Sequence, residues 1–475
     1  MTALGEARST GPNVQQLLER DTRAVPVSLR DTSTAYQGSS DVPRTRYTSP
    51  AFADLENEYL WTRTWQMACT EDQLRQPGDH VVYDVADQSL IVVRDRSGAI
   101  RAYHNSCLHR GTKLRVDDGR VASFRCPFHG WRWDLEGSLT EVPASWDFPQ
   151  ITEDPLRSCL PEAAVATWCG FVFVNMAPEP IPFVRYADKL IEHFGRDFDM
   201  ADRYVAFHAV KEVPANWKVC MEAFGEAYHV IATHPQILEF CADTNSEYSV
   251  WPDSPYVTRF FNAFGVGSPH LGDLSPQQVA DAQMTFSSRA PRGAITVPDG
   301  GEARPLVAEV FRNAMSERFG ADLSDVSDAE VLDAVLYHLF PAFAPWAGIG
   351  QSLVYRWRPG STPDTCFMDV IRMARVPDGQ PRPERAEMQV LTLEQSWKEA
   401  KGMSGLADVF EQDMANLPRV QAGLKSKGAK GVSFGLYQEG RMRLLHRLID
   451  QCILEGLADD GRSDAELAPF RMSAD

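Results

Sequence analysis

Long hydrophobic runs are the first feature missing from this chain of 475 residues. No stretch approaches the roughly 20 consecutive apolar residues that a membrane-spanning helix needs. The first residues, MTALGEARST, also lack the apolar core of a secretory signal peptide. We therefore expect a cytoplasmic protein with no membrane partner.

Positive charge is also scarce. The chain carries 47 Lys and Arg residues against 65 Asp and Glu residues, which gives a formal net charge of −18. Binding to nucleic acid or to an anionic membrane requires a concentrated basic surface, and this composition disfavours both partners. An acidic surface suits solubility and the docking of a basic partner protein.

Cysteine is sparse and mostly without paired spacing. Seven of the nine Cys residues are scattered, namely Cys69, Cys159, Cys169, Cys220, Cys241, Cys366 and Cys452. Reduced thiols fit this pattern better than a disulfide framework does. The length and the 44% hydrophobic content are compatible with a large enzyme of two or three domains.

The other two Cys residues belong to two short motifs. Cys107-Leu-His109 and Cys126-Pro-Phe-His129 are separated by the sixteen residues 110–125. Each motif supplies one thiolate and one imidazole, which is the ligand set of a Rieske two-iron, two-sulfur cluster. A zinc site is the alternative that spacing alone leaves open, although zinc fingers usually place both Cys in one motif and both His on a later helix.

The pattern of apolar residues predicts an α+β chain with an all-β domain first. We expect an N-terminal arm at 1–45, disordered or lying on a neighbouring subunit; a β domain with a flanking helix at 46–180; an α+β domain of antiparallel sheet and helices at 181–460; and a tail at 461–475. The expected helices are 46–60, 217–232, 329–339 and 406–425. The expected strands are 81–84, 90–94, 101–104, 131–137, 170–175, 204–213 and 353–358.

A polar segment at 265–304 interrupts the second domain. It contains Ser-Ser-Arg-Ala-Pro-Arg-Gly at 287–293 and Pro-Asp-Gly-Gly at 298–301. Long irregular stretches inside a compact domain are lids or loops more often than core. An active-site lid, a surface loop and a subunit contact all remain open.

A second group of metal-binding residues follows Asn216-Trp217-Lys218. His229 and His234 are five residues apart, which on a regular helix separates them by about 140°. A π-bulge, or a helix end at His234 before Pro235, would bring both rings to one side. On a continuous helix Glu222, Glu226 and His229 would share one face, so that Glu226 orients the ring of His229.

Together, the two Cys/His motifs, the Asn-Trp-Lys sequence and the Glu-Ala-Tyr-His-x4-His sequence resemble the catalytic α subunit of Rieske non-haem iron oxygenases of the ring-hydroxylating type. The resemblance covers about residues 45–450. It implies one [2Fe-2S] cluster bound by Cys107, His109, Cys126 and His129. It also implies one mononuclear Fe(II), held by His229, His234 and a distant carboxylate.

The distant carboxylate is sought between residues 408 and 423. Asp413 matches the family best, because it begins an Asp-x-x-Asn step and precedes Val-Gln-x-Gly. Glu411 is the second candidate and Asp408 the third. Without the resemblance, the charged residues of this helix would be interpreted as its solvent-exposed face.

The resemblance further implies how electrons reach the iron. The family usually has Asp where this chain has Glu226, and that acid bridges a cluster histidine of one subunit to an iron histidine of the next. A glutamate there resembles a minority of members, including some that act on quaternary amines. A head-to-tail homotrimer is implied, and a β subunit is an open possibility.

The electron donor is expected to be a separate reductase or ferredoxin fed by NAD(P)H. The chain has no Gly-x-Gly-x-x-Gly fingerprint and no additional cluster motif. The implied reaction is hydroxylation by O2 of an aromatic or other bulky hydrophobic substrate. Oxidation of a quaternary or N-methyl amine is the alternative. Two further alternatives are an electron-transfer Rieske protein without catalysis and a zinc-stabilised binding module.

Aromatic residues cluster at two places in the second domain. The runs at 260–264 and 339–346 are rich in Phe and also contain Trp346. They are plausible walls of a substrate pocket, with core packing as the equal alternative. An aromatic cage for a trimethylammonium group is also compatible with this composition.

Overall fold

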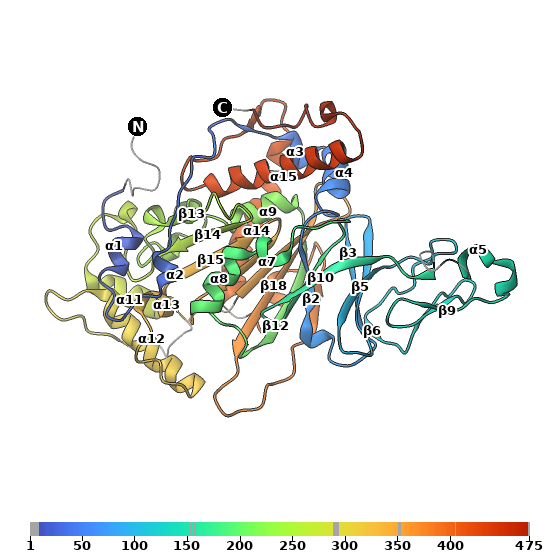
Figure 1. Ribbon diagram of the computed structural model, residues 1–475. Coiled ribbons are helices and arrows are strands. Elements are labelled where there is room, and N and C mark those ends of the chain that lie inside the picture. The colour runs from blue at the N-terminus through green and yellow to red at the C-terminus, as the bar shows by residue number, and fades with distance from the viewer. Residues whose placement is uncertain are drawn as a thin grey trace. The chain divides into compact units, whose positions relative to one another are not determined.

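The computed structural model describes residues 9–152, 154, 158–287, 294–349, 353–403 and 405–473. The chain divides into two compact units, which are residues 54–185 and, as a second unit, residues 1–53 together with 186–475. The divisions at 53/54 and 185/186 lie near the expected ones at 45/46 and 180/181. Figure 1 labels many of the elements of both units.

The unit of residues 54–185 contains two antiparallel sheets. The larger has the strand order β2-β11-β10-β5-β4-β3-β6 and the smaller has the order β7-β8-β9. The bounds are β2 Gln66–Thr70, β3 Asp79–Val85, β4 Gln88–Arg94, β5 Ile100–His104, β6 Gly119–Arg120, β7 Phe124–Arg125, β8 Arg132–Trp133, β9 Leu139–Glu141, β10 Glu162–Trp168 and β11 Phe171–Asn175. The strands expected at 81–84, 90–94, 101–104 and 170–175 are confirmed, as is the all-β class.

The strand expected at 131–137 is shorter than predicted. Only β8 is extended, because the chain turns after it and Gly137 N–H donates to the Asp134 carbonyl. Gly137 has a φ of 85°, and a Cβ there would lie 2.6 Å from the ring of Tyr103. The turn therefore requires glycine. It lies against the core that joins β4 and β5 to Trp131 and Trp133.

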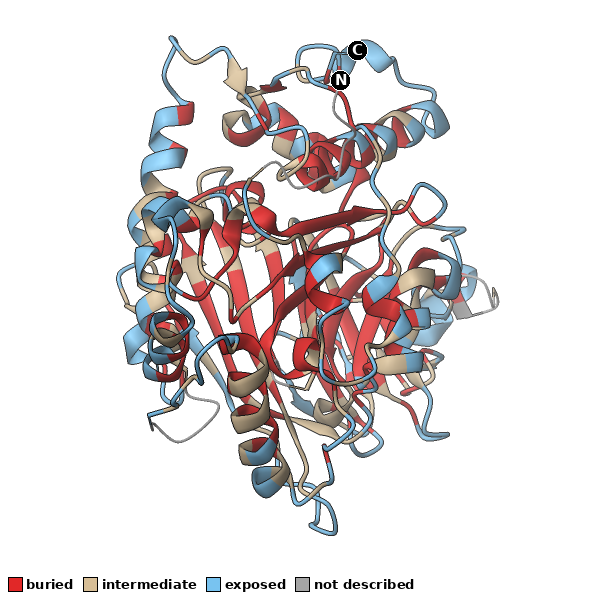
Figure 2. Ribbon diagram, turned by 90° about the vertical axis from the view of Figure 1, so that its left-hand side faces the viewer, coloured by how far each residue is buried: buried red, intermediate tan, exposed pale blue. Residues whose placement is uncertain are grey.

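The second unit is built on an eight-stranded sheet. Its order is β13-β14-β15-β16-β17-β18-β12-β19, antiparallel except for the parallel pair β12 and β19. The bounds are β12 Arg203–Val213, β13 Glu247–Val250, β14 Val257–Asn262, β15 Ala334–Leu339, β16 Phe343–Ala347, β17 Leu353–Pro359, β18 Cys366–Arg375 and β19 Met388–Leu391. Most of these strands are buried along their length (Figure 2). The strands expected at 204–213 and 353–358 are confirmed.

Helices and short strands complete the two units. Their bounds are α1 Val14–Leu18, α2 Val27–Arg30, β1 Val42–Pro43, α3 Thr45–Thr48, α4 Pro50–Tyr59, α5 Pro149–Thr152, α7 Phe183–Tyr186, α8 Asp188–Asp197, α9 Trp217–Ala223, α10 Val230–Thr233, α11 Pro276–Phe286, α12 Ala303–Phe319, α13 Asp328–Leu332, α14 Leu406–Leu424, β20 Gly431–Val432 and α15 Gly440–Asp459. The helix expected at 406–425 is confirmed as α14. The predicted helix 46–60 is divided between α3 and α4, and α4 begins at Pro50.

Two expected helices differ from the structure. The predicted helix 217–232 is interrupted after Ala223 and resumes as α10. The predicted helix 329–339 is only α13, and Ala334–Leu339 is the buried strand β15. A short apolar run does not distinguish a buried strand from a helix, and here pairing with β14 and β16 decides the outcome.

The polar segment at 265–304 is not irregular throughout. Helix α11 begins at Pro276, with Ser275 as a capping residue whose side chain accepts from Gln278 N–H. Its buried face packs with α12 in one apolar cluster. Residues 288–293 of this segment lie outside the described part of the chain, so the lid prediction stays a prediction.

The N-terminal segment lies on the second unit of its own chain. The described part begins at residue 9, and Arg259 of β14 donates to the carbonyls of Ser28 and Asp31 at 2.5 and 2.9 Å. Thr22 donates through its hydroxyl to Asp328 at 2.7 Å. These buried polar groups take their partners from residues 22–31, which is why a polar segment is ordered here without an apolar period of its own.

Candidate metal centres

Two similar loops of the β unit carry the four Cys and His side chains of the first candidate site. In the first loop Gly111 N–H donates to the Cys107 carbonyl at 2.8 Å, and in the second Gly130 N–H donates to the Cys126 carbonyl at 3.1 Å. Both glycines have positive φ, 75° and 80°. Each motif is therefore a tight turn that starts at a Cys and closes at a Gly.

The four side chains converge. Cys107 and Cys126 are 3% and 2% exposed and belong to one buried cluster. The rings of His109 and His129 have centroids 4.6 Å apart. His109 also stacks on Trp131 with an interplanar angle of 7° and a centroid distance of 5.1 Å, which fixes the plane of its ring.

The polar groups of these loops fit a [2Fe-2S] cluster. His109 Nδ1 is buried and has no hydrogen-bond partner in the described structure, as expected of an atom reserved for a metal. Burial raises the pKa of the Cys107 thiol. Burial acts in the same direction on Cys126, but backbone N–H groups of Phe128 and His129 stabilise its thiolate, and the pKa of Cys126 is lowered overall. The donor set is thus two thiols and two imidazoles, and each loop supplies one of each kind.

The second candidate site begins where helix α9 ends. Asn216 caps this helix by accepting a hydrogen bond from Lys218 N–H at 3.1 Å. After Ala223 the chain leaves the helical path, and it regains it only at His229, which is the N-cap of α10. Glu222 and His229 therefore do not lie on one continuous helix face, and the predicted shared face is wrong.

His234 lies directly after the last residue of α10. Its φ and ψ of −126° and 50° are not helical, and Pro235 opens the next turn. The helix end that the sequence offered as one way to bring the histidines together is present. The rings of His229 and His234 have centroids 5.1 Å apart.

Asp413 of α14 meets both imidazoles. Its Oδ1 lies 3.0 Å from His234 Nε2 and 3.8 Å from His229 Nε2. One ligand atom of each residue lies within 4.8 Å of the other two. Two imidazoles and one carboxylate in this arrangement fit a non-haem iron that keeps positions open for other ligands.

The second nitrogen of each imidazole is held by a neighbouring side chain. His229 Nδ1 lies 2.7 Å from Glu226 Oε1, and His234 Nδ1 lies 2.8 Å from Gln412 Oε1. Because a carboxylate and an amide oxygen accept hydrogen bonds, both Nδ1 atoms carry the proton. In the neutral rings Nε2 is then the unprotonated nitrogen, and in both residues it faces Asp413. Burial disfavours the cation of His229, but the hydrogen bond and the negative charge of Glu226 outweigh burial, so the pKa of His229 is raised.

The other two carboxylates considered on α14 point elsewhere. Glu411 accepts from the Ser396 hydroxyl at 2.8 Å and from Trp397 N–H at 2.6 Å. Asp408 is exposed and pairs with Lys398 at 2.8 Å. Of the three candidates, only Asp413 lies with the two histidines.

Three further residues of this region were not found from the sequence. Gln412 orients His234, and Gln421 Oε1 accepts from Asn216 N–H at 3.0 Å, which ties α14 to the start of α9. The only sequence feature that could have indicated Gln412 and Gln421 is their position on the same helix as Asp413. Arg441 of α15 is buried, and its guanidinium Nη1 donates to the Gly225 carbonyl at 3.0 Å. No sequence motif indicates a role for Arg441.

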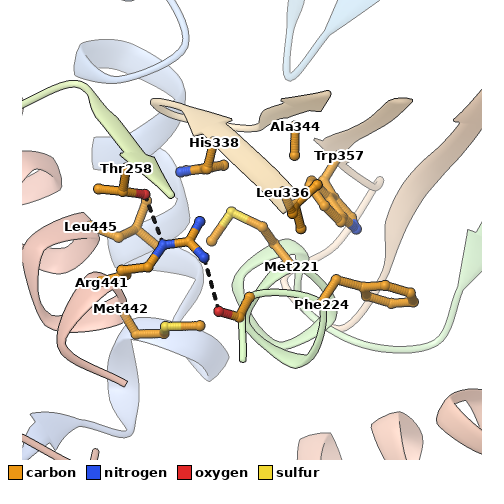
Figure 3. Close-up of a pocket in the computed structure, with 11 residues that line it drawn as sticks. Met221, Phe224, Thr258, Leu336, His338, Ala344, Trp357, Arg441, Met442 and Leu445 are labelled. Carbon is orange, nitrogen blue, oxygen red and sulfur yellow. Dashed lines mark hydrogen bonds between the residues drawn. The ribbon is translucent and has the colours of Figure 1, made fainter. Parts of the chain in front are cut away.

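A small cavity adjoins the segment between α9 and α10. Its lining residues are Met221, Phe224, Gly225, Thr258, Leu336, His338, Ala344, Trp357, Arg441, Met442 and Leu445 (Figure 3). Of the two aromatic runs expected as pocket walls, at 260–264 and 339–346, only Ala344 lines this cavity. Phe260, Phe261 and Phe343 are buried on β14 and β16 as core residues.

Comparison with known families agrees with this geometry. Residues 198–455 match the family model "Ring hydroxylating alpha subunit (catalytic domain)", and residues 64–152 match the "Rieske [2Fe-2S] domain". The first match alone spans more than half of the chain. The chain belongs to the ring-hydroxylating alpha-subunit family. It carries a Rieske domain followed by the catalytic domain of that family, with antiparallel sheet and helices.

Several curated proteins are similar over part of the chain. The glycine betaine monooxygenase oxygenase subunit of Pseudomonas aeruginosa is 28% identical over 42% of this chain and 46% of its own length. The carnitine monooxygenase oxygenase subunit of Acinetobacter baumannii is 29% identical over 41% and 52%. The chlorobenzene dioxygenase subunit alpha of Cupriavidus sp. is 30% identical over 39% and 42%. The chain spans about half the length of these relatives.

Solved structures share the fold over most of the chain. A quaternary ammonium Rieske monooxygenase in complex with L-carnitine has a TM-score of 0.58 at 18% identity, with 87% of this chain and 95% of that chain covered. Naphthalene 1,2-dioxygenase with indole bound has a TM-score of 0.61 at 18% identity, with 92% and 98% covered. Within the described residues, no helix has the length and apolarity needed to span a membrane.

Proposed function

We propose that this family member is the terminal oxygenase component of a multi-protein system, which hydroxylates a small molecule with O2. The observation that carries the proposal is the meeting of His229 Nε2, His234 Nε2 and Asp413 Oδ1 within 4.8 Å, in a chain that also holds two Cys/His loops. A protein that only transferred electrons would have no use for such a second site.

Cys107, His109, Cys126 and His129 would hold the [2Fe-2S] cluster, and His229, His234 and Asp413 would hold one mononuclear Fe(II). When bound, the cluster supplies single electrons and the ferrous iron supplies the position at which O2 reacts. His129 is exposed, so its ring edge is accessible to another subunit or to a donor.

The chain's own side chains prepare the iron site before any metal binds. Glu226 and Gln412 hold the Nδ1 protons of the two histidines, so the lone pairs of both Nε2 atoms face the metal position. Glu226 is mostly buried, and its Oε2 accepts from His229 N–H at 3.0 Å. We propose that this carboxylate also accepts a hydrogen bond from a cluster histidine of a neighbouring subunit and so links the two centres.

For the substrate we propose an aromatic or other bulky hydrophobic compound. Apolar side chains dominate the lining of the cavity beside Phe224, and the relatives include a chlorobenzene dioxygenase subunit. A quaternary or N-methyl amine is the second candidate. It is favoured by Glu226 in place of the usual Asp and by the similarity to glycine betaine and carnitine monooxygenase subunits.

Partners are part of the same proposal. A separate reductase or ferredoxin would deliver electrons from NAD(P)H, and the chain would work as a homotrimer, with a β subunit as an optional addition. A cytoplasmic location accords with the acidic composition and with the lack of long apolar runs.

The test is iron and acid-labile sulfide per chain on anaerobically purified protein, with the reduced-state electron paramagnetic resonance spectrum of the same sample. About three irons and two sulfides with a Rieske signal support the oxygenase. Two irons and two sulfides that persist after incubation with ferrous iron would favour an electron carrier. Colourless protein that contains zinc would contradict both.

A further inference from the structure

The cavity beside Gly225 contains a charged group that the proposed reaction does not use. Arg441 is 6% exposed, and its guanidinium lies among the lining residues (Figure 3). Its Nε donates to Thr258 Oγ1 at 2.9 Å, and its Nη1 donates to the Gly225 carbonyl at 3.0 Å. Within the part of the chain that the structure describes, Nη2 has no hydrogen-bond acceptor.

No carboxylate of the described chain contacts this guanidinium. Two other buried arginines of this unit differ, since Arg259 pairs with Glu247 at 2.8 Å and Arg304 pairs with Asp333 at 2.7 Å. A buried cation without an anion costs several kcal/mol unless something compensates it. Burial lowers the pKa of Arg441 to about 9, which still leaves it charged at neutral pH.

The other titratable group of the cavity adds no negative charge. His338 Nε2 donates to the Pro341 carbonyl at 3.0 Å. Burial, together with the charge of Arg441, lowers the pKa of His338 to about 3, so the ring is neutral. Figure 3 shows the free side of the guanidinium directed toward His338 and Met221. The cavity therefore presents one positive donor between apolar walls.

The cavity lies against the segment that carries the iron histidines. Phe224 and Gly225 line it, and Glu226 and His229 follow them closely in the chain. Phe224 also packs on Phe410 of α14 with ring centroids 5.3 Å apart. A molecule held in the cavity thus touches the segment that leads to the histidines, and Phe224 connects that segment to the helix that carries Asp413.

We propose that this cavity is the substrate site and that Arg441 binds a carboxylate, or a similar oxyanion, of the substrate. The inference rests on the proposed oxygenase function and narrows its substrate class. It favours an aromatic acid or a zwitterion that carries a carboxylate, and it disfavours a substrate that is only cationic. A planar guanidinium presents paired N–H donors that match a carboxylate.

Flexible side chains explain how a small cavity admits a substrate. As it stands in the structure, the cavity has a volume of only about 20 Å³, which is room for about one water molecule. Met221 and Met442 form part of the wall, and a Cβ added at Gly225 would lie 2.3 Å from Met442 Cε. Methionine side chains adopt new rotamers at low cost, so the cavity widens when a ligand enters.

The experiment compares ligands that differ in charge but hardly in shape. Benzoate is paired with benzamide, and glycine betaine is paired with choline, which lacks the carboxylate. Phenyltrimethylammonium is the cationic probe. Binding to the metal-loaded protein is measured by isothermal titration calorimetry without electron donor, so that the result does not depend on turnover.

We expect the carboxylate member of at least one pair to bind at least about tenfold more tightly than its partner. The pair that shows the preference distinguishes an aromatic acid from a betaine. In Arg441→Gln the preference disappears, and in Arg441→Lys, which keeps the charge, part of it remains. Met442→Leu, a matched change in the same wall, keeps the preference.

Three controls establish that Arg441 itself carries the preference. Circular dichroism and the visible spectrum of the cluster establish that each variant is folded. Benzoate can also ligate iron, so Asp413→Ala, which is expected to lack the mononuclear iron, must retain the carboxylate preference. Metal analysis of the wild type tests the proposed function separately.

A wild-type protein with no carboxylate preference in either pair overturns the proposal, and so does one that binds none of the five compounds. A preference that persists in folded Arg441→Gln overturns it as well, and so does one lost in Asp413→Ala. In those two cases another group, or the iron, binds the anion.

Discussion

Glu226 and His229 form a two-point contact. The carboxylate accepts from the backbone N–H of His229 at 3.0 Å with one oxygen and lies 2.7 Å from Nδ1 of its ring with the other. Backbone and ring are thus held together, and the lone pair of Nε2 is aimed at Asp413. Gln412 holds the ring of His234 at one point, with the neutral amide oxygen. Both histidines are therefore held through Nδ1, but they differ in the charge of the group behind them.

The first prediction concerns the charge of Glu226. Glu226→Gln should retain both metals but lower turnover by about 100-fold. The amide is neutral and has one accepting oxygen in place of two, so it no longer stabilises a positive charge on His229 and leaves one fewer oxygen to accept from a neighbouring cluster histidine. Turnover with a matched reductase is measured together with the rate of cluster reduction, which should not change. Glu226→Asp, which restores the usual family residue, is the control and should keep most activity. Equal turnover in the glutamine variant would end the bridging hypothesis.

The second prediction identifies the iron carboxylate. Asp413→Ala should lose the mononuclear iron and keep the cluster spectrum, since Asp413 is the acid that meets both imidazoles. Iron per chain then falls by about one. Glu411→Gln is the matched control, because it alters an acid of the same helix that contacts Ser396 and Trp397 instead. Iron loss in the control rather than in Asp413→Ala would reassign the ligand.

The third prediction concerns the acceptor behind His234. Gln412→Met has nearly the same volume but no oxygen for His234 Nδ1, so both the tautomer and the ring orientation lose their support. We expect iron affinity to weaken by about 10- to 100-fold, measured by competition with a ferrous chelator. Gln412→Glu retains an acceptor and should bind iron at least as well as the wild type. Unchanged affinity in the methionine variant would show that packing alone holds the ring.

The fourth prediction is a pH dependence of stability. Glu222 is buried beside Tyr47 and His446, which approach its Oε1 at 3.1 and 2.9 Å, and burial raises its pKa from 4.5 to about 8. The folded protein thus holds a proton between pH 4.5 and 8 that the unfolded chain releases. Stability from this group is fully present below pH 4.5 and is lost as the pH rises through 8.

Glu222→Gln mimics the protonated acid and should remove that loss. Relative to the variant, the wild type should lose up to about 1 kcal/mol per pH unit over this range. Urea unfolding at pH 5 and pH 8 measures the difference. Parallel pH profiles for the two proteins would mean that Glu222 is ionised throughout.

Local patterns were sufficient for most of the β structure. Short runs rich in β-branched and aromatic residues, bounded by turn residues, predicted most of β3, β4, β5 and β12. Helix α14 was equally visible from its period of 3.6. The short apolar run that became β15 was assigned to a helix, because periodicity alone does not distinguish a buried strand from a buried helix and no turn residue separates this run from α13.

In the candidate sites, too, residues close in sequence could be predicted and distant ones could not. A tight turn brings together the Cys and the His of each motif, Cys107 with His109 and Cys126 with His129, and the pairing of the two motifs predicted that the loops converge. His229 and His234 needed a helix end, which Pro235 signalled. Asp413 was chosen only through the family resemblance, since 178 residues and most of a sheet separate it from the nearer histidine.

The sequence by itself determined the ligand types, the loops that carry the cluster residues and the order of the two domains, because these depend on neighbours along the chain. Only the tertiary structure decided which of three carboxylates on α14 faces the histidines, which residue holds each Nδ1 proton, and that Arg441 is buried without an acid beside it. Those outcomes depend on how α9, α14 and α15 pack. Packing between distant segments is set by the summed burial of many side chains, which no local pattern contains.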